Sequence, residues 1–224
     1  MKQAFLALPG WPFLRFAWLL LLANGLWFAF VYGGCDWLTA QRSARVQIHL
    51  PIELSIPLVP AMVLAYMSIY LLFLAGPFII RDRREFSALI SGLALATLVG
   101  GIGFLLLPSE AAYAPPGELG IWKGLFQFAD GLNLTYNMVP SLHVALSICC
   151  ISAFTRRASR ALRFLLWTWG ATIAVSTILT HQHHVIDVVS GWCLGLGVSL
   201  VTVGRLESGP SATVRQPVTA TPPS

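Results

Sequence analysis

The stretch "FSALISGLALATLVGGIGFLLLP", residues 86–108, contains no charged side chain. A helix crosses the hydrocarbon core of a bilayer with about 20 mostly apolar residues, so this stretch is long enough to span a membrane. The whole chain has the same character, because 56% of its 224 residues are hydrophobic and only 10% are charged. A soluble globular domain carries about 25% charged residues. The composition therefore predicts a helical membrane protein and excludes an ordinary soluble domain.

Further apolar runs give the chain the pattern of a protein that crosses the membrane several times. Together with the first stretch, the runs occupy residues 16–34, 54–80, 86–108, 138–155, 164–180 and 188–204. The last three are shorter and lie near the lower length limit for a span. We therefore expect an all-α membrane protein with six transmembrane helices, forming one domain over residues 1–204. Residues 205–224 are rich in Pro, Ser, Thr and Val, and we expect them to form a disordered cytoplasmic tail.

The distribution of Lys and Arg sets the expected orientation of these helices. Of the 14 basic residues, only Arg42, Arg45 and Lys123 fall on the side opposite the N-terminus. Because basic residues accumulate on the cytoplasmic side, we expect both termini in the cytoplasm and the long connections outside. The net charge of +5 then reflects topology and does not predict nucleic-acid binding. The short chain favours a bacterial inner membrane, with the outer side facing the periplasm or the exterior.

A first polar stretch, "NMVPSLHVALS" at residues 137–147, opens the fourth predicted helix. Pro140 suits the first turn of a helix, where its missing N–H costs nothing. Ser141 and His143 are then expected in that same turn, at the outer end of the span. An ionisable residue near the end of a membrane helix is costly and is a candidate for function.

A second polar stretch, "THQHHVIDVV" at residues 180–189, opens the last predicted helix. His183 and Asp187 are four residues apart, so on a helix they share a face. This helix and the one that starts near Pro140 both run inward from the outer side, so their N-termini lie on the same surface. Helix N-termini expose unpaired N–H groups and a partial positive charge. Two such ends that carry His predict an anion site, and phosphate is the anion that we expect.

Less specific interpretations of these residues stay open. His143 fits an interfacial histidine bonded to a backbone carbonyl, and His183 with Asp187 fits a structural pair that joins two helices. A metal site made by the three histidines of the second stretch and Asp187 has suitable ligand types but not HExxH spacing. We therefore predict no metal, and His184 receives no role. The four cysteines show no metal-ligand spacing and are expected to be packing residues without disulfides.

These residues give the chain a resemblance to the type 2 phosphatidic acid phosphatase superfamily of membrane enzymes. The second motif of that family contains Pro-Ser-x-His, which "PSLH" at residues 140–143 matches. The third motif is Ser-Arg, followed after five residues by His and after three more residues by Asp. Ser176, His183 and Asp187 match that motif, whereas Thr177 stands where the family has Arg. The first motif, Lys, six residues, Arg-Pro, has no match in the chain.

Within that superfamily, the two stretches look more like the branch that contains inositol phosphorylceramide and sphingomyelin synthases and related bacterial proteins. The resemblance covers roughly residues 50–204. It implies a membrane enzyme that transfers phosphoryl groups without a cofactor and takes a phosphorylated lipid from the surrounding membrane lipids. It does not indicate the oligomeric state or the identity of the lipid.

The resemblance also implies a role for each matching residue. His183 attacks phosphorus and forms a phosphohistidine, while Asp187 accepts the other ring N–H and orients the imidazole. His143 protonates the leaving alkoxide, for which an imidazole that titrates near neutrality is suited. Ser141 and the first amides of its helix bind phosphate oxygens, so no metal is required.

The basic residues of the missing motifs need replacements that balance the phosphate charge. His181 lies two residues from the expected nucleophile and is the first choice, although an ordinary solvated loop histidine is the alternative. Lys123 is the next choice. It lies in the aromatic-rich, amphipathic stretch 120–132, for which a passive position at the membrane interface is the simpler interpretation.

Three functions are compatible with these features. The first is a lipid phosphatase, in which water releases phosphate from the phosphohistidine. The second is a lipid phosphotransferase or headgroup transferase, in which an alcohol takes the phosphoryl or phosphodiester group. The third is a non-catalytic membrane protein that keeps the fold. The missing basic residues weaken the case for a monoester substrate, because a monoester dianion needs more cationic cover than a diester anion.

Overall fold

The computed structural model describes residues 4–208, with side chains described to residue 202. The described residues form α-helices and short 3-10 helices, and they contain no strand. The elements in order are α1 (Trp11–Ala40), η1 (Pro51–Ser55), η2 (Pro60–Met62), α2 (Val63–Met67), α3 (Ile69–Ile79), α4 (Arg83–Leu106), η3 (Gly120–Trp122), α5 (Lys123–Leu132), α6 (Leu142–Thr155), α7 (Arg160–Leu179) and α8 (Val185–Ser208).

Helix α8 runs past the predicted start of the tail. Residues 205–208 continue α8, so the boundary predicted at residue 205 is wrong by one turn of helix. The rest of the predicted tail, residues 209–224, lies outside the described residues.

Five segments of the described chain are long and apolar enough to cross a membrane: α1, the η2–α2–α3 segment Pro60–Ile79, α4, α7 and α8. They correspond to five of the six predicted spans and make the chain an integral membrane protein. The fourth predicted span is wrong in its extent, because α6 has 14 residues and residues 138–141 are not helical. At 1.5 Å per residue α6 is about 21 Å long, which is less than the roughly 30 Å of a hydrocarbon core.

The short helix α6 lies in the middle of the bundle, where it contacts α3, α4, α7 and α8. Nearly all of its residues are buried, in keeping with a helix that is apolar on every side. Glycines let the neighbours approach closely. A Cβ on Gly170 would lie 2.6 Å from Ile151 Cδ1, and one on Gly195 would lie 2.6 Å from the carbonyl oxygen of Ala145. Because its neighbours surround it, α6 does not need to match the thickness of a bilayer by itself.

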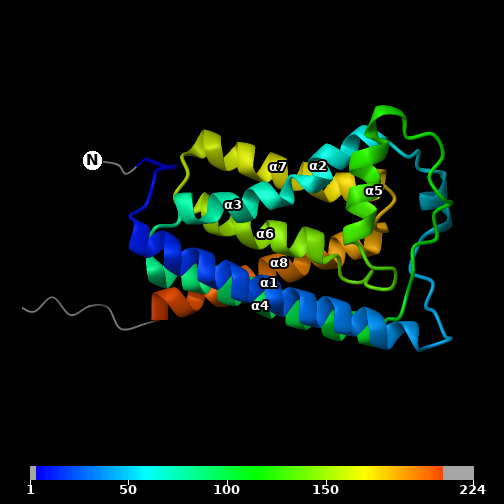
Figure 1. Cartoon of the computed structure of the whole chain (residues 1–224), viewed down its shortest axis with the longest axis horizontal. Coiled ribbons are helices and arrows are strands. Elements are labelled where there is room, and N and C mark those ends of the chain that lie inside the picture. Colours follow the sequence, from blue (N-terminus) through cyan, green and yellow to red (C-terminus); the bar gives the residue numbers. More distant parts are fainter. Residues whose placement is uncertain (1–3, 209–224) are drawn as a thin grey trace, which may run out of the picture.

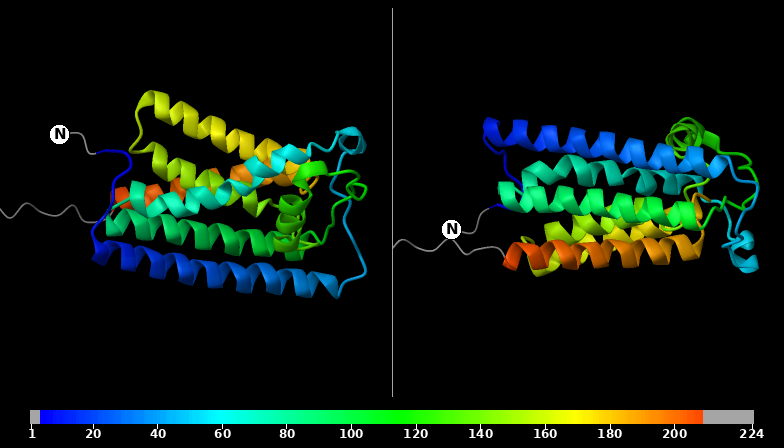
Figure 2. Two further views of the ribbon diagram at one scale, coloured as in Figure 1. Left: turned by 45° about the horizontal axis from the view of Figure 1, so that its top comes forward. Right: turned by 90° about the horizontal axis from the view of Figure 1, so that it is seen from below.

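The two ends of the bundle differ, with short turns between helices at one end and long loops with α5 at the other (Figures 1 and 2). One end, here called the Arg-rich end, holds the start of α1, the α3–α4 turn, the α6–α7 turn and the end of α8. There Arg157 Nη2 lies 2.7 Å from Glu85 Oε2 and joins two of these turns. The other end, here called the loop end, holds residues 41–59, residues 107–141 and the short α7–α8 connection. Helix α5 lies across the bundle at the loop end, where the histidines of both polar stretches also lie.

Candidate active site

His183 and Asp187 form a hydrogen-bonded pair at the start of α8. Nδ1 of His183 lies 3.3 Å from Oδ2 of Asp187, and the same oxygen accepts the backbone N–H of His184 at 2.8 Å. The expectation that the pair shares a helix face is wrong in detail, because His183 precedes the first helical residue, Val185. Its position comes from α7, whose Thr177 carbonyl accepts the His183 amide at 3.0 Å. Since a carboxylate only accepts, Nδ1 carries the proton and Nε2 is left for other chemistry.

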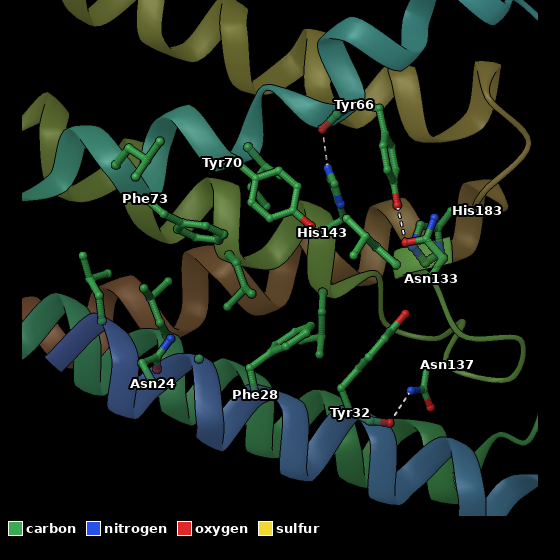
Figure 3. A pocket seen from close by; sticks show the side chains of 18 of the residues that line it. Asn24, Phe28, Tyr32, Tyr66, Tyr70, Phe73, Asn133, Asn137, His143 and His183 are labelled. Atoms are coloured by element: carbon green, nitrogen blue, oxygen red, sulfur yellow. Dashed lines mark hydrogen bonds between the residues drawn. The ribbon is translucent and has the colours of Figure 1, made fainter. Parts of the chain in front are cut away.

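His143 is held by α2 rather than by its own helix. Its Nε2 lies 2.7 Å from the carbonyl oxygen of Tyr66, and its ring stacks on the Tyr66 ring with centroids 3.9 Å apart (Figure 3). Because a carbonyl oxygen can only accept, Nε2 of His143 donates. Nδ1 is therefore the nitrogen of this imidazole that is left to exchange a proton with a substrate.

The N-terminal ends of α6 and α8 are joined directly, as the topology predicted. The backbone N–H of Ser141 donates to the carbonyl of Asp187 at 2.9 Å. A Cβ on Gly191 would collide with the carbonyl oxygen of Ser141, so glycine is what allows the two helices to meet here. Pro140 lies before the N-cap rather than in the first turn, which corrects the predicted helix start.

Ser141 is the N-cap of α6. Its hydroxyl is buried and accepts the backbone N–H of Val144 at 3.4 Å, satisfying one of the free N–H groups at the helix start. The hydroxyl therefore has a structural partner already, and its contact with phosphate stays a prediction.

A cavity of about 350 Å³ brings the catalytic candidates together. His143 and His183 both line it, with α1 and α3 as its side walls and α6 behind (Figure 3). Most of the lining is apolar. The remaining polar lining groups are amides and phenols: Asn24, Tyr32, Tyr66, Tyr70, Asn133 and Asn137. Among the described residues that line this cavity there is no Lys or Arg.

The two predicted replacements for the missing basic residues do not line the cavity. His181 has a positive φ of 58°, its Nε2 donates to the Ile56 carbonyl at 3.0 Å, and its ring stacks on Tyr113 at 4.1 Å. Lys123 is exposed at the first position of α5. Neither position supports the predicted contact with phosphate.

The end of α5 covers the cavity through a chain of side-chain hydrogen bonds. Oδ1 of Asn133 accepts the Tyr66 hydroxyl at 2.7 Å, and Nδ2 of Asn133 donates to Oε1 of Gln182 at 2.7 Å. Gln182 in turn donates to Oδ1 of Asp130 at 2.7 Å. Because Gln182 precedes His183 in the chain, this network links α5 to the segment that carries the candidate nucleophile.

Sequence reasoning missed a second carboxylate–histidine pair beside the first. Oε2 of Glu53 lies 3.1 Å from Nδ1 of His184 and accepts the backbone N–H of Val185 at 3.0 Å, while Oε1 accepts the N–H of Leu50 at 3.0 Å. The backbone N–H of Ala112 donates to Nε2 of His184 at 3.1 Å, which places the imidazole proton on Nδ1. The only signal in the sequence was an acidic residue within an apolar stretch, "PIELS", and nothing in it indicated the partner.

Burial and hydrogen bonding shift both groups of this second pair. Burial lowers the pKa of His184, and the nearby carboxylates oppose that shift only in part. Burial by itself would raise the pKa of Glu53, but the hydrogen bonds from Val185, Leu50 and His184 hold it below its ordinary value. The pair is therefore a neutral imidazole that donates to a carboxylate.

The metal cluster considered from the sequence is not assembled. Among the described residues, no group of three His, Cys, Asp or Glu side chains converges to hold a metal ion. The rings of His181 and His184 both stack on the ring of Tyr113, and each histidine also bonds a group of the residue 41–59 segment, the Ile56 carbonyl and the Glu53 carboxylate respectively. The four cysteines are free, and Cys193 is exposed rather than packed inside the bundle.

Comparison with known proteins places this site in a family. A sequence model of the PAP2 superfamily matches residues 40–201, which include Glu53, His143, His183 and Asp187. Helix α1 lies outside the match except for its last residue. A search of curated protein sequences finds no match. Because the family match covers more than half of the chain and all of the candidate catalytic residues, the chain belongs to the PAP2 superfamily.

Proposed function

We propose that the protein is a membrane phosphatase that acts on a phosphorylated lipid through a phosphohistidine on His183. Membership of the PAP2 superfamily supports phosphatase-type or phosphotransferase-type chemistry. The observation that carries the proposal is the shared cavity. His183, backed by Asp187, reaches it from the α7–α8 connection, and His143 reaches it from α6.

The reaction follows from the nitrogens that are left without protein partners. Nε2 of His183 attacks phosphorus, and the bond from phosphorus to the lipid oxygen breaks. Asp187 accepts the Nδ1–H and stabilises the charged imidazole that forms. His143 starts this step as the imidazolium, and its Nδ1–H passes to the leaving alkoxide while Nε2–H stays on the Tyr66 carbonyl. Water then attacks the phosphohistidine, His143 takes back a proton, and phosphate leaves His183.

The shape of the cavity supports a lipid rather than a water-soluble substrate. Its lining on α1 runs from Trp18 to Tyr32, which is about 21 Å along the helix at 1.5 Å per residue. Trp18, Tyr70 and Leu74 line the cavity and are also 40%, 43% and 52% exposed, so the cavity reaches the outer surface of the bundle. In a bilayer that surface faces acyl chains. A lipid with its phosphate at the histidines would keep its chain in an apolar environment.

We further propose six spans with both termini in the cytoplasm. The basic residues of the Arg-rich end support a cytoplasmic position for that end. The histidines then open toward the periplasm or the exterior, and a bacterial inner membrane is the proposed location.

A second candidate function is transfer of the phosphoryl or phosphodiester group to an alcohol. The absence of Lys and Arg from the described cavity lining favours it. A diester carries one negative charge and needs less cationic cover than a monoester dianion. In that case the alcohol replaces water in the second step, and His143 accepts its proton.

Both candidates are tested by one experiment on the purified full-length protein. A panel of phosphorylated lipids and lipid phosphodiesters is incubated under chelator, with and without an added lipid alcohol, while free phosphate and new lipids are measured. Phosphate release that His183→Ala abolishes supports the phosphatase. A new lipid that forms only with the alcohol supports the transferase. Turnover that survives unchanged in His183→Ala would contradict both.

A further inference from the structure

One wall of the cavity comes from α1, which lies outside the part of the chain that matches the family. The α1 residues that line it include Trp18, Leu21, Gly25, Phe28 and Tyr32. Their spacing alternates between three and four residues, which places them on one face of the helix. The candidate catalytic residues therefore lie within the family match, whereas this lining face is contributed by an element outside it.

Gly25 is the small residue in the middle of this face. A Cβ built on Gly25 meets no atom within 4 Å, whereas the other four members of the face are large. It lies seven residues from Tyr32, which is about 10 Å along the helix axis. Tyr32 is at the end of the face near the histidines, because Asn137 of the loop end donates to its carbonyl at 2.6 Å (Figure 3). Gly25 is exposed and leaves a gap in this face about 10 Å farther from the loop end than Tyr32.

We propose that Gly25 determines the length of hydrocarbon chain that the cavity accepts. This inference rests on the proposed function, since the chain belongs to a lipid whose phosphate lies at His143 and His183. With glycine at position 25, the chain passes the middle of α1 and reaches the apolar surfaces of Leu21 and Trp18. A larger side chain at this position fills the gap and stops the chain there.

The expected effect follows from packing, because a chain that cannot pass position 25 loses its contacts with the Leu21 and Trp18 side chains. Gly25→Leu blocks the cavity beyond position 25, so long chains lose those contacts and short chains do not. The substitution also replaces glycine inside a helix with a better helix former, so it does not weaken α1. Gly25→Ala fills only a methyl-sized part of the gap and gives a smaller shift in the same direction.

The test measures kcat/KM for one phosphorylated headgroup on chains of 8 to 18 carbons. We expect Gly25→Leu to lower the ratio of long-chain to short-chain kcat/KM at least tenfold. Gly34→Leu is the matched control, because a Cβ at Gly34 also meets nothing within 4 Å but Gly34 does not line the cavity. We expect this control to keep the chain-length ratio of the unmodified protein.

A binding measurement separates this inference from the proposed function. The affinities of octyl and hexadecyl phosphate are measured in the His183→Ala background. This measurement does not depend on turnover. A selective loss of hexadecyl phosphate binding in Gly25→Leu supports the inference even if no lipid is hydrolysed. An unchanged preference in both kinetics and binding overturns it, while phosphate release that depends on His183 would leave the proposed function standing.

Discussion

His183 and His184 are adjacent, and each is paired through Nδ1 with a buried carboxylate, yet their surroundings differ. His183 is 7% exposed, lines the cavity, and among the described residues makes no hydrogen bond through Nε2. His184 is fully buried, and both of its nitrogens are occupied, by Glu53 and by the amide of Ala112. The same kind of pair, an imidazole with a carboxylate, thus leaves a ring nitrogen open to the cavity in one case and fastens a loop to α8 in the other. What separates them is whether the second nitrogen has a protein partner.

Removing the imidazole of His183 is the substitution with the largest expected effect on activity. We expect His183→Ala to lower turnover by at least about 10³-fold, in line with the loss of a nucleophile. Thermal stability should also fall, because the substitution removes the Nδ1 partner of the buried Asp187, so the loss of turnover per folded molecule is the distinguishing result. Phosphate release and thermal stability in the same detergent measure the two effects. A variant that loses stability instead of activity would make the two histidines alike and break the comparison.

Asp187→Asn tests how the carboxylate prepares His183. An amide keeps the shape but removes the charge that stabilises the protonated imidazole, and it disturbs the tautomer. We expect turnover to fall by about 10² to 10⁴-fold, with a smaller change in KM. Steady-state kinetics with a single lipid phosphate separates kcat from KM. Normal kcat in this variant would show that the pair is structural.

His184→Ala should differ from His183→Ala in its effect on turnover. It leaves Glu53, which is 2% exposed, without its imidazole partner. Losing a hydrogen bond to a buried charged carboxylate costs about 1.5–3 kcal/mol, so the free energy of unfolding should fall by a similar amount. Turnover per folded molecule should fall much less than in His183→Ala. Chemical denaturation monitored by tryptophan fluorescence measures the loss, and unchanged stability would remove the proposed role of His184.

The smallest expected effect is the pH dependence of stability that the second pair confers. Burial lowers the pKa of His184 in the folded protein, so below about pH 6.5 the unfolded chain binds the proton first and stability falls. The lowered pKa of Glu53 gives a contribution that is present above about pH 4.3 and is lost as the pH falls through the folded value. Glu53→Gln should remove the lower part of this acid sensitivity in thermal melts from pH 8 to 2. A melting temperature with the same pH profile in both proteins would argue against the pair.

Much of this arrangement could be predicted from local sequence patterns. The uncharged runs predicted the positions of five spans. The alternating direction of successive spans predicted that α6 and α8 start at the same end of the bundle. The four-residue spacing of His183 and Asp187 predicted that their side chains lie close together. They do, although His183 lies before the first residue of α8. These features depend on residues that are close in the sequence, where periodicity and helix geometry are informative.

The rest depends on contacts between distant residues. Glu53 and His184 are 131 positions apart, so no spacing rule could pair them. The shortness of α6 could not be inferred, because a helix surrounded by other helices shows the same apolar composition as one that faces lipid. His181 was expected near phosphate from its proximity in sequence to His183, but its positive φ and the Ile56 carbonyl hold its ring in the loops.

The central claim is that Nε2 of His183 becomes covalently bonded to phosphorus. The most direct test incubates the protein with a lipid whose phosphate is radiolabelled, stops the reaction with alkali, and maps the labelled peptide. The proposed mechanism predicts an alkali-stable, acid-labile label on His183, absent from His183→Ala and increased in His143→Ala when a good leaving group is used. A label on another residue, or turnover by His183→Ala at the normal rate, would contradict the mechanism.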